Sequence, residues 1–269
     1  MTPIGRLPTL FIPHGGGPCF FMDAQPPLPP AAWDRMAAYL RGIGAALRVR
    51  PTAVLVISSH WEAPVPTLNV AGKPTLIFDY YGFPQHTYRL QYPAPGAPEL
   101  APRVRSLLAG AGFESAVDAT RGFDHGVFVP FLLIYPDASV PILQLSLQQG
   151  LDAGMHFELG RALAPLRDEG VLIVGSGMSY HNLTDLFCGR GNDAAAAFDA
   201  WLAAAVRDPG KRGGELAAWA SAPGGRAAHP RAEHLIPLMV AAGAGDGDTG
   251  TRSFNGSIGG KALSGFQFG

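Results

Sequence analysis

The sequence of residues Leu7–Pro18 is LPTLFIPHGGGP, in which a short apolar run comes directly before a histidine and three glycines. The run Leu10–Ile12 stops at Pro13, and apolar runs this short and this abruptly ended are typical of buried strands. His14 then follows the carboxyl end of a strand, where open α/β sheets bind their ligands. Gly15–Gly17 lack a Cβ atom, so the backbone there can turn sharply and approach a ligand closely. Taken alone, the stretch is better explained as a glycine-rich turn with an incidental histidine.

The same arrangement recurs along the chain, and this recurrence changes the interpretation of His14. His60 and His181 each follow an apolar run with the character of a strand, and His125 and His234 each precede a run with the character of a helix. Five of the eight histidines therefore lie next to the ends of expected elements.

The rest of the pattern alternates short apolar runs with longer amphipathic ones, as βαβ units around a mostly parallel sheet do. Expected strands are Leu10–Ile12, Val54–Ile57, Pro141–Ser146 and Val171–Gly177, and expected helices are Ala31–Arg48, Pro98–Ala111, Val127–Tyr135, His156–Glu169, Ala194–Val206 and Leu235–Ala242. Spaced apolar residues in the tail 251–269 predict antiparallel edge strands near the C-terminus. The segment Ala63–Pro98, dense in Pro, Gly and aromatic residues, predicts a long functional loop. We therefore predict a single α/β domain over residues 1–269, with helices flanking its central sheet.

The composition excludes several classes of protein. The chain of 269 residues is 47% hydrophobic and 15% charged, which supports a sizeable core and argues against disorder. A formal net charge of -1 and the lack of a basic block argue against nucleic-acid binding. No apolar run approaches the roughly 20 residues of a membrane span, and the N-terminus does not resemble a signal peptide. We therefore expect a cytoplasmic protein in which Cys19 and Cys188 are free thiols.

Several histidines at one rim of a sheet predict a metal site. Neutral imidazole is the commonest metal ligand in proteins, and it also titrates near neutral pH, so such a cluster can supply both ligands and proton carriers. The alternative is that most of these histidines are separate loop residues with their own hydrogen bonds. A phosphate-binding loop at Gly15–Gly17 is disfavoured, because Pro18 follows and no helix begins there.

Motifs along almost the whole chain resemble those of the class III extradiol ring-cleaving dioxygenases, the family of the protocatechuate 4,5-dioxygenase catalytic subunit. The similarity is greatest to the single-chain branch that resembles 4,5-DOPA extradiol dioxygenase. The motifs are Phe11–Gly15, Ile57–Trp61, Asp79–Pro84, Tyr92–Gly96, Gly122–Gly126, Pro141–Ser146, Gly175–Gly177 with His181–Leu183, Pro230–His234 and Phe266–Gly269.

The resemblance implies a mononuclear non-haem Fe(II) centre. Its first two ligands correspond to His14 and His60, and the third corresponds to His234. Glu233 is the alternative third ligand, because two histidines and one carboxylate are the usual set for an oxygen-activating iron. Three histidines would suit Zn(II) equally well, so the isolated protein could carry zinc.

The resemblance also implies the reaction, which is the oxygen-dependent opening of a catechol ring to a semialdehyde acid. His181 is expected to act as the base for the second catechol proton, and it could also serve as a fourth metal ligand. His125 is expected to act as the acid. Asp124 is expected either to orient His125 or to cap a helix.

Aromatic residues in these motifs are candidates for the walls of a substrate pocket, although such residues more often belong to the core. They are Trp61, Tyr80, Tyr81, Phe83 and Tyr180. Relatives usually have His-Gly-Ser-Pro where this chain has a histidine, three glycines and a proline, and a smaller or aliphatic residue at position 180. No chemistry is assigned to the three other histidines, His86, His156 and His229.

Two other functions stay open at this point. A zinc hydrolase also uses histidine ligands and one open coordination position. A binding protein could keep the fold without the oxygenase reaction. For the enzyme, the expected partners are a catechol and O₂, with the chain acting as a monomer or a small homo-oligomer.

Overall fold

Four short apolar runs form four neighbouring strands in the computed structural model, which describes residues 5–23, 26–186 and 189–269. The strands are β1 (Thr9–Pro13), β2 (Ala53–Ala63), β5 (Ile142–Gln148) and β6 (Val171–Gly177). They run parallel in the order β5-β2-β6-β1. Their residues are almost all buried, because both faces of this part of the sheet are covered. The continuous apolar runs in the sequence reflect this burial.

The full sheet has eight strands in the order β4-β3-β5-β2-β6-β1-β8-β7. β8 (Lys261–Phe268) pairs antiparallel with β1, and β7 (Gly250–Ile258) pairs antiparallel with β8. The antiparallel strands predicted near the C-terminus are therefore confirmed, although only β7 lies at an edge. At the other side, β3 (Thr67–Asn69) is antiparallel to β5 and parallel to β4 (Ala116–Asp118). The sequence pattern missed these two strands because each has only three residues.

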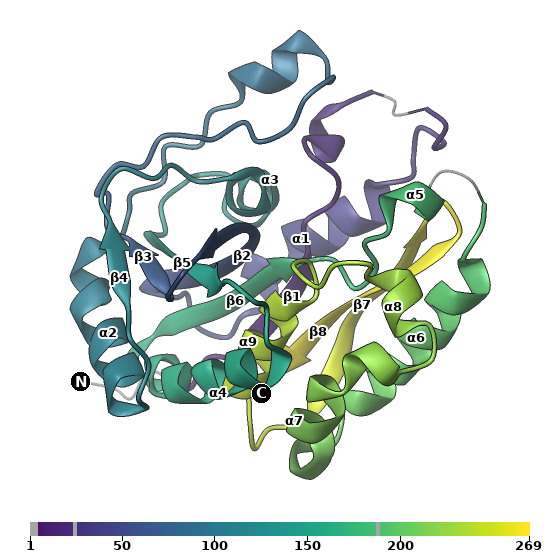
Figure 1. The fold of residues 1–269 in the computed structure, drawn as a ribbon. Helices are drawn as coiled ribbons and strands as arrows, with labels where there is room; N and C mark the ends of the chain where they lie inside the picture. Colours follow the sequence, from purple (N-terminus) through teal and green to yellow (C-terminus); the bar gives the residue numbers. More distant parts are fainter. Residues whose placement is uncertain (1–4, 24–25, 187–188) are drawn as a thin grey trace.

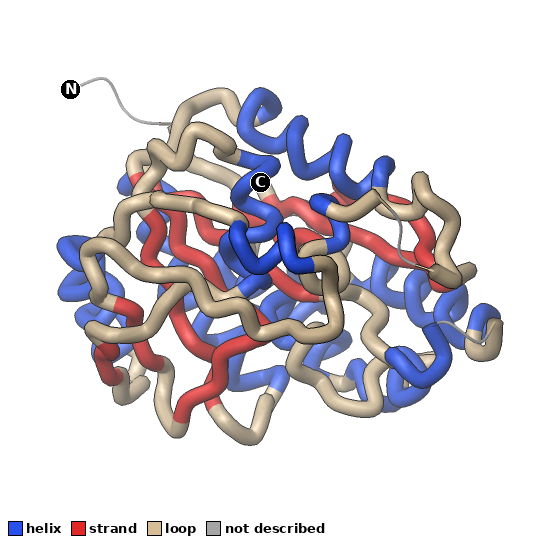
Figure 2. Tube along the Cα trace, turned by 90° about the horizontal axis from the view of Figure 1, so that it is seen from above, coloured by secondary structure: helices blue, strands red, loops and turns tan. Residues whose placement is uncertain are grey.

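Helices cover both faces of the sheet (Figure 1), and all six predicted helices are present with shifted ends. One face carries α1 (Asp34–Ala46) and α3 (His125–Ile134), and the other carries α2 (Ala101–Gly110), α4 (Ala153–Leu163), α9 (Ile236–Ala244), α6 (Asn192–Ala205) and α7 (Pro209–Ala217). The short helices are α5 (Leu183–Leu186) and α8 (Gly225–Ala228), and 3₁₀ turns lie at Cys19–Phe21, Gln85–Arg89, Pro98–Leu100, Ala164–Glu169 and Trp219–Ser221. Viewed from above, long loops occupy much of the surface (Figure 2).

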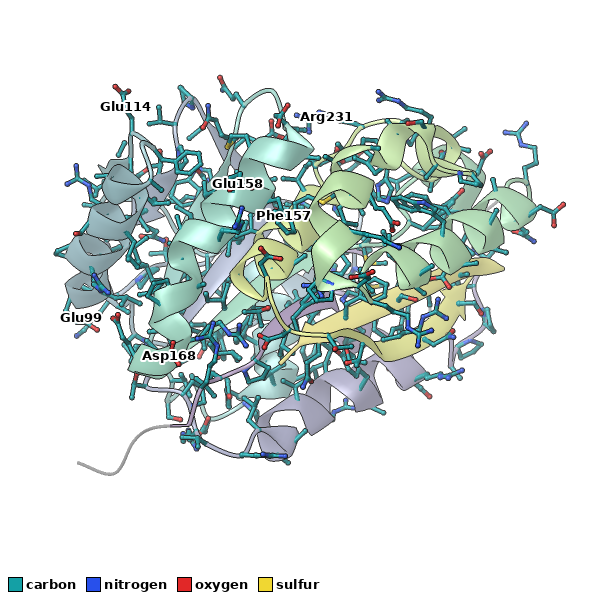
Figure 3. The ribbon with its side chains drawn as sticks, turned by 90° about the horizontal axis from the view of Figure 1, so that it is seen from below. Glu99, Glu114, Phe157, Glu158, Asp168 and Arg231 are labelled. Carbon is teal, nitrogen blue, oxygen red and sulfur yellow. The ribbon has the colours of Figure 1, made fainter. Side chains whose placement is uncertain are left out.

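Glycines let α9 pack directly against the backbone of its neighbours. A Cβ atom on Gly175 of β6 would lie 2.2 Å from the Pro237 carbonyl oxygen, and one on Gly177 would lie 2.1 Å from the His234 carbonyl oxygen. A Cβ atom on Gly243 of α9 would lie 2.0 Å from the carbonyl oxygen of Phe157, a residue of α4 labelled in Figure 3. The contacts of Gly175 and Gly177 fix the N-terminal end of α9, and therefore His234, over the carboxyl end of β6.

Two buried arginines hold the other end of α9. Arg167 donates to the Ala244 carbonyl over 3.0 Å and pairs with Asp248 at 2.6 Å. Arg212 donates to the Gly245 carbonyl over 3.0 Å. The last carbonyls of a helix have no partner within the helix, so these guanidinium groups satisfy acceptors that would otherwise be buried alone.

The carboxyl end of β2 departs from regular pairing. Ile57 pairs with Leu145 of β5, whereas the next paired residue, Glu62, is opposite Leu147. Five steps along β2 therefore correspond to two along β5, and the intervening residues bulge. Bulges next to active sites commonly re-aim a side chain, and His60 lies in this one. His60 is therefore inside β2 rather than beyond its end.

Two further observations concern cysteines and membranes. Cys19 is a buried free thiol, and Cys188 lies outside the described residues. Among the residues that the structure describes, no helix is both long enough and apolar enough to cross a membrane.

Candidate metal centre

The five histidines singled out by the sequence converge at the carboxyl ends of β1, β2 and β6. The ring of His14 has its centroid 5.0 Å from that of His60, 5.5 Å from that of His125 and 5.2 Å from that of His234. His181 stacks on His234 with centroids 3.4 Å apart and ring planes 16° apart. The cluster draws on both halves of the chain, because the parallel strands carry their loops to one edge of the sheet.

Ser176 determines which nitrogen of His14 carries the proton. The Ser176 hydroxyl donates its only hydrogen to the Gly126 carbonyl, and its oxygen lies 3.1 Å from His14 Nδ1. The hydroxyl must therefore accept from an Nδ1–H group, which leaves Nε2 of His14 with a free lone pair. This Nε2 atom lies 3.2 Å from Nε2 of His60.

His60 is also oriented through its Nδ1, in this case by a carboxylate. Its Nδ1 lies 3.5 Å from Asp79 Oδ2, which favours a proton on Nδ1 and a lone pair on Nε2. Two imidazole lone pairs thus face each other across 3.2 Å. With metal–nitrogen bonds of about 2.1 Å, two ligands on one ion are about 3.0 Å apart in octahedral geometry and about 3.4 Å apart in tetrahedral geometry.

His234 completes a group of three. The ligand nitrogens of His14, His60 and His234 all lie within 4.8 Å of one another. Backbone packing fixes His234, because Met178 at the end of β6 donates its N–H to the His234 carbonyl over 3.0 Å. The donor set, three imidazoles with free nitrogens facing one another, fits a single divalent cation.

All three histidines are neutral near pH 7. Burial lowers the pKa of His14 and of His234 well below 6.5, and the nearby imidazoles lower both pKa values further. Burial and the neighbouring His125 lower the pKa of His60 to about 4. Metal ligation requires neutral imidazole, so the fold keeps these groups ready to bind a cation.

Glu233 contacts two histidines by their Nδ1 edges. Its Oε1 lies 3.0 Å from Nδ1 of His234 and 3.3 Å from Nδ1 of His181, and its Oε2 lies 3.5 Å from Nη1 of Arg231. Although burial opposes it, the hydrogen bond with His181 lowers the pKa of Glu233, so the group is a carboxylate. The Nε2 atoms of both rings therefore point away from Glu233. The carboxylate contacts the Nδ1 side of His234, and it is His234 that forms the group of three with His14 and His60.

His125 is oriented by Asp79, so the expectation that Asp124 orients it is wrong. Asp79 Oδ1 lies 2.9 Å from Nδ1 of His125 and accepts the backbone N–H of the same residue over 2.9 Å. Asp124 stands at the N-cap position of α3, but its side chain makes no capping hydrogen bond. It accepts instead from Ser58 over 2.6 Å and from Arg121 over 3.0 Å. Because Ser58 belongs to β2, these hydrogen bonds connect the start of α3 to the bulge.

The predicted wall residues have different surroundings. Tyr80 contacts His125 edge-on, with centroids 5.8 Å apart, and Phe83 packs on Tyr80. Trp61 packs under the guanidinium group of Arg121 at 4.6 Å. Tyr81 does not form part of a wall, because it is 92% exposed. Tyr180 is buried and, with His181, lines an apolar cavity of about 50 Å³.

The three remaining histidines lie outside the cluster. His156 donates from Nδ1 to the Asp152 carbonyl and accepts the Gln148 N–H at Nε2, so it joins α4 to the end of β5. His229 lies 3.1 Å from the Ser179 carbonyl through Nε2, and His86 is exposed. The sequence analysis missed Asp79 and Ser176. Asp79 opens the motif Asp79–Pro84, and that position was the one available signal.

The chain also matches a family model. Residues 8–264 match the model described as the catalytic LigB subunit of aromatic ring-opening dioxygenase. The match spans β1 through the first half of β8, and so includes all five clustered histidines.

Known relatives and a solved structure agree with this match. A 4,5-DOPA dioxygenase extradiol from Beta vulgaris is 48% identical over 199 residues, which are 72% of this chain and 74% of the relative. A 4,5-DOPA dioxygenase extradiol from Escherichia coli is 36% identical over 252 residues, which are 90% of this chain and 86% of the relative. The crystal structure of an uncharacterized protein from Escherichia coli K12 superposes with a TM-score of 0.77 at 30% identity, covering 98% of this chain and 100% of that one. The chain therefore belongs to the family of the catalytic LigB subunit of aromatic ring-opening dioxygenases.

Proposed function

We propose that this protein is an extradiol dioxygenase that opens the ring of a catechol-type substrate at a single divalent metal ion. His14, His60 and His234 would hold the ion. The observation that carries the proposal is the group of three imidazole nitrogens within 4.8 Å of one another, in a chain of this family. A bound Fe(II) would supply a template on which the catechol oxygens and O₂ meet, and Zn(II) could occupy the same ligands in the isolated protein.

His181 is the proposed base for the second catechol proton. Its Nδ1 faces the Glu233 carboxylate at 3.3 Å, so the proton belongs on Nδ1 and the lone pair of Nε2 is free to accept. A positioned histidine of this kind contributes about 10²–10⁴-fold to the rate of a reaction that needs proton transfer. The same orientation leaves His181 able to serve as a fourth ligand.

His125 is the proposed acid. Its Nδ1 lies 2.9 Å from Oδ1 of Asp79, and this contact fixes the orientation of the ring. The His125 Nε2 atom points away from Asp79, and it would take up a second proton and deliver it when His125 acts as the acid. Tyr80 packs edge-on against the ring of His125. The product would be an open-chain semialdehyde acid.

Metal loading followed by oxygen uptake tests the proposal. The protein is loaded anaerobically with Fe(II) or with Zn(II), and a panel of catechols is added in an oxygen electrode. We expect oxygen uptake and a yellow semialdehyde product from the Fe(II) form alone. No uptake with any catechol, together with ester hydrolysis by the Zn(II) form, would instead support a zinc hydrolase.

Replacing the proposed base separates its two possible roles. In His181→Gln, we expect the metal content to stay at the wild-type level while kcat falls by about 10²–10⁴-fold. Metal content is measured by elemental analysis and kcat by oxygen uptake. A parallel loss of metal would identify His181 as a ligand. His86→Gln, at an exposed histidine outside the cluster, is the control.

A further inference from the structure

Asp79 contacts two members of the histidine cluster at once. Its Oδ1 accepts the backbone N–H of His125 over 2.9 Å and lies 2.9 Å from Nδ1 of the same residue. Its Oδ2 lies 3.5 Å from Nδ1 of His60. One carboxylate therefore links a residue expected to bind the metal with a residue expected to move a proton.

Backbone hydrogen bonds between the segment before Asp79 and the segment before His125 place Asp79 in this position. Ile77 donates its N–H to the Phe123 carbonyl, and Phe123 donates its N–H to the Thr75 carbonyl, both over 2.8 Å. The two segments run parallel at this bridge, so Asp79 and His125 emerge from it side by side. The approach is close, because a Cβ atom on Gly122 would lie 2.6 Å from the Thr75 carbonyl oxygen.

The two contacts fix the protonation pattern of both rings. A carboxylate has no hydrogen to donate, so each ring must place its proton on the Nδ1 that faces Asp79. Nε2 of His60 is then free toward His14, and Nε2 of His125 is free on the side away from Asp79.

We propose that Asp79 is the positioning residue of this site, which acts through His125 by holding its tautomer and ring orientation, with a smaller effect on His60. The proposal rests on the proposed function of His125 as the acid. Removal of a carboxylate that orients a functional histidine commonly costs about 10–100-fold in activity or metal affinity.

Two substitutions of different severity test this role in the Fe(II)-loaded enzyme. Asp79→Ala removes both acceptors, and we expect kcat to fall by about 10–100-fold while KM for the catechol changes by less than about 3-fold. Asp79→Asn keeps one oxygen acceptor and should recover part of the loss. Asp118→Asn is the matched control, because Asp118 accepts backbone N–H groups of Thr120 and Arg121 and contacts no histidine.

A double substitution shows whether Asp79 acts through His125. In the His125→Ala background, Asp79→Ala should lower kcat by less than about 3-fold further, because the group that Asp79 positions is already gone. Full multiplication of the two losses would overturn the proposal. An unchanged kcat in Asp79→Ala, in an enzyme whose wild type turns over, would overturn it as well.

A spectroscopic measurement makes the test independent of turnover. In the Zn(II)-loaded protein labelled with ¹⁵N-histidine, the imidazole nitrogen shifts report the tautomer of each ring. We expect His125 to carry its proton on Nδ1 in the wild type and to lose this preference in Asp79→Ala. If the wild type cleaves no catechol but the tautomer changes, the proposed function fails and the positioning role stands. An unchanged tautomer would disprove the role.

Discussion

Ser176 sets the tautomer of His14, although no catalytic or metal-binding role is proposed for Ser176 itself. Its oxygen lies between the Gly126 carbonyl and His14 Nδ1, and its single hydrogen leaves only one way to satisfy both. From the sequence, Ser176 was one polar residue at the end of an apolar run, and nothing in the run reveals a contact across 162 positions. The histidines themselves could be predicted, because each stands beside an element whose pattern is clear.

Substitution of Ser176 should weaken metal binding without removing a ligand. In Ser176→Ala, Nδ1 of His14 loses its acceptor, so we expect the metal dissociation constant to rise by about 10-fold or more. Competition with a chromophoric chelator measures it. Ser146→Ala is the control, because Ser146 is equally buried near the end of β5 and accepts the Thr67 N–H rather than contacting a histidine. Equal affinities in the two variants would contradict the assignment.

His229 should make stability fall in acid. Burial lowers its pKa to about 4, against 6.5 for an exposed histidine. The unfolded chain therefore binds a proton that the folded chain does not, between about pH 6.5 and pH 4, and stability is lost as the pH falls through this window. This residue alone would account for about 3 kcal/mol at the acid end.

The measurement is urea unfolding at several pH values. As the pH falls, the free energy of unfolding should decrease less steeply in His229→Gln than in the wild type. The reason is that the variant takes up about one proton fewer on unfolding across this window. Gln keeps an amide N–H that can donate to the Ser179 carbonyl, so stability above pH 7 should change less than at pH 5. Identical slopes for both proteins would show that His229 is protonated when folded.

At the scale of the elements, regular parts were predictable and irregular parts were not. The strands β1, β2, β5 and β6 and the six predicted helices follow from periodicity, since burial on one face or two leaves a mark in the sequence. The bulge in β2 leaves no such mark, because it depends on the network of Asp124, Ser58 and Arg121 beneath it. Asp79 was missed for the same reason, since it meets His125 across 46 positions.

Gly126 of α3 shows how an element aims a side chain. A Cβ atom there would lie 2.5 Å from Ser58 Oγ and 3.0 Å from Cδ2 of His60. Gly126→Ala should therefore displace His60, weaken metal binding and cost about 1–3 kcal/mol of stability, despite the better helix propensity of alanine. Thermal unfolding and the chelator competition would measure both effects.

Gly110 of α2 offers the matched control. A Cβ atom at Gly110 has nothing within 4 Å, so Gly110→Ala should leave metal affinity unchanged and stability equal or slightly higher. If Gly126→Ala behaves like Gly110→Ala, the contact between α3 and β2 does not set the position of His60.

At the scale of the whole molecule, buried arginines tie distant parts together. Arg167 donates to the carbonyls of Leu7 and Ala244, and so joins the start of the described chain to the end of α9. Arg212 donates to the carbonyls of Val206 and Gly245, and packs over the ring of Phe268 at 4.6 Å. The sequence does not reveal these two arginines as buried, because charged residues are rarely buried unless paired and their acceptors come together only in the fold.

Removing Arg212 should destabilise the fold strongly. In Arg212→Met, the apolar stem is retained while the buried carbonyls at the end of α9 lose their donor, so we expect about 2–4 kcal/mol less stability. Arg161→Met is the control, because Arg161 is half exposed and its ion pairs with Glu158 and Asp246 are worth under about 1 kcal/mol. Denaturant unfolding compares them, and similar midpoints would contradict the role of Arg212.

The seam along α9 has a consequence for anyone who wishes to redesign this scaffold. Gly175, Gly177 and Gly243 leave space for nothing larger than a hydrogen atom, so α9 packs on β6 and α4 directly through its backbone. Mutant libraries that vary these positions would mostly yield misassembled protein. Tyr80, which contacts His125, and Tyr180, which lines a cavity with His181, are the better positions at which to vary the surroundings of the histidines.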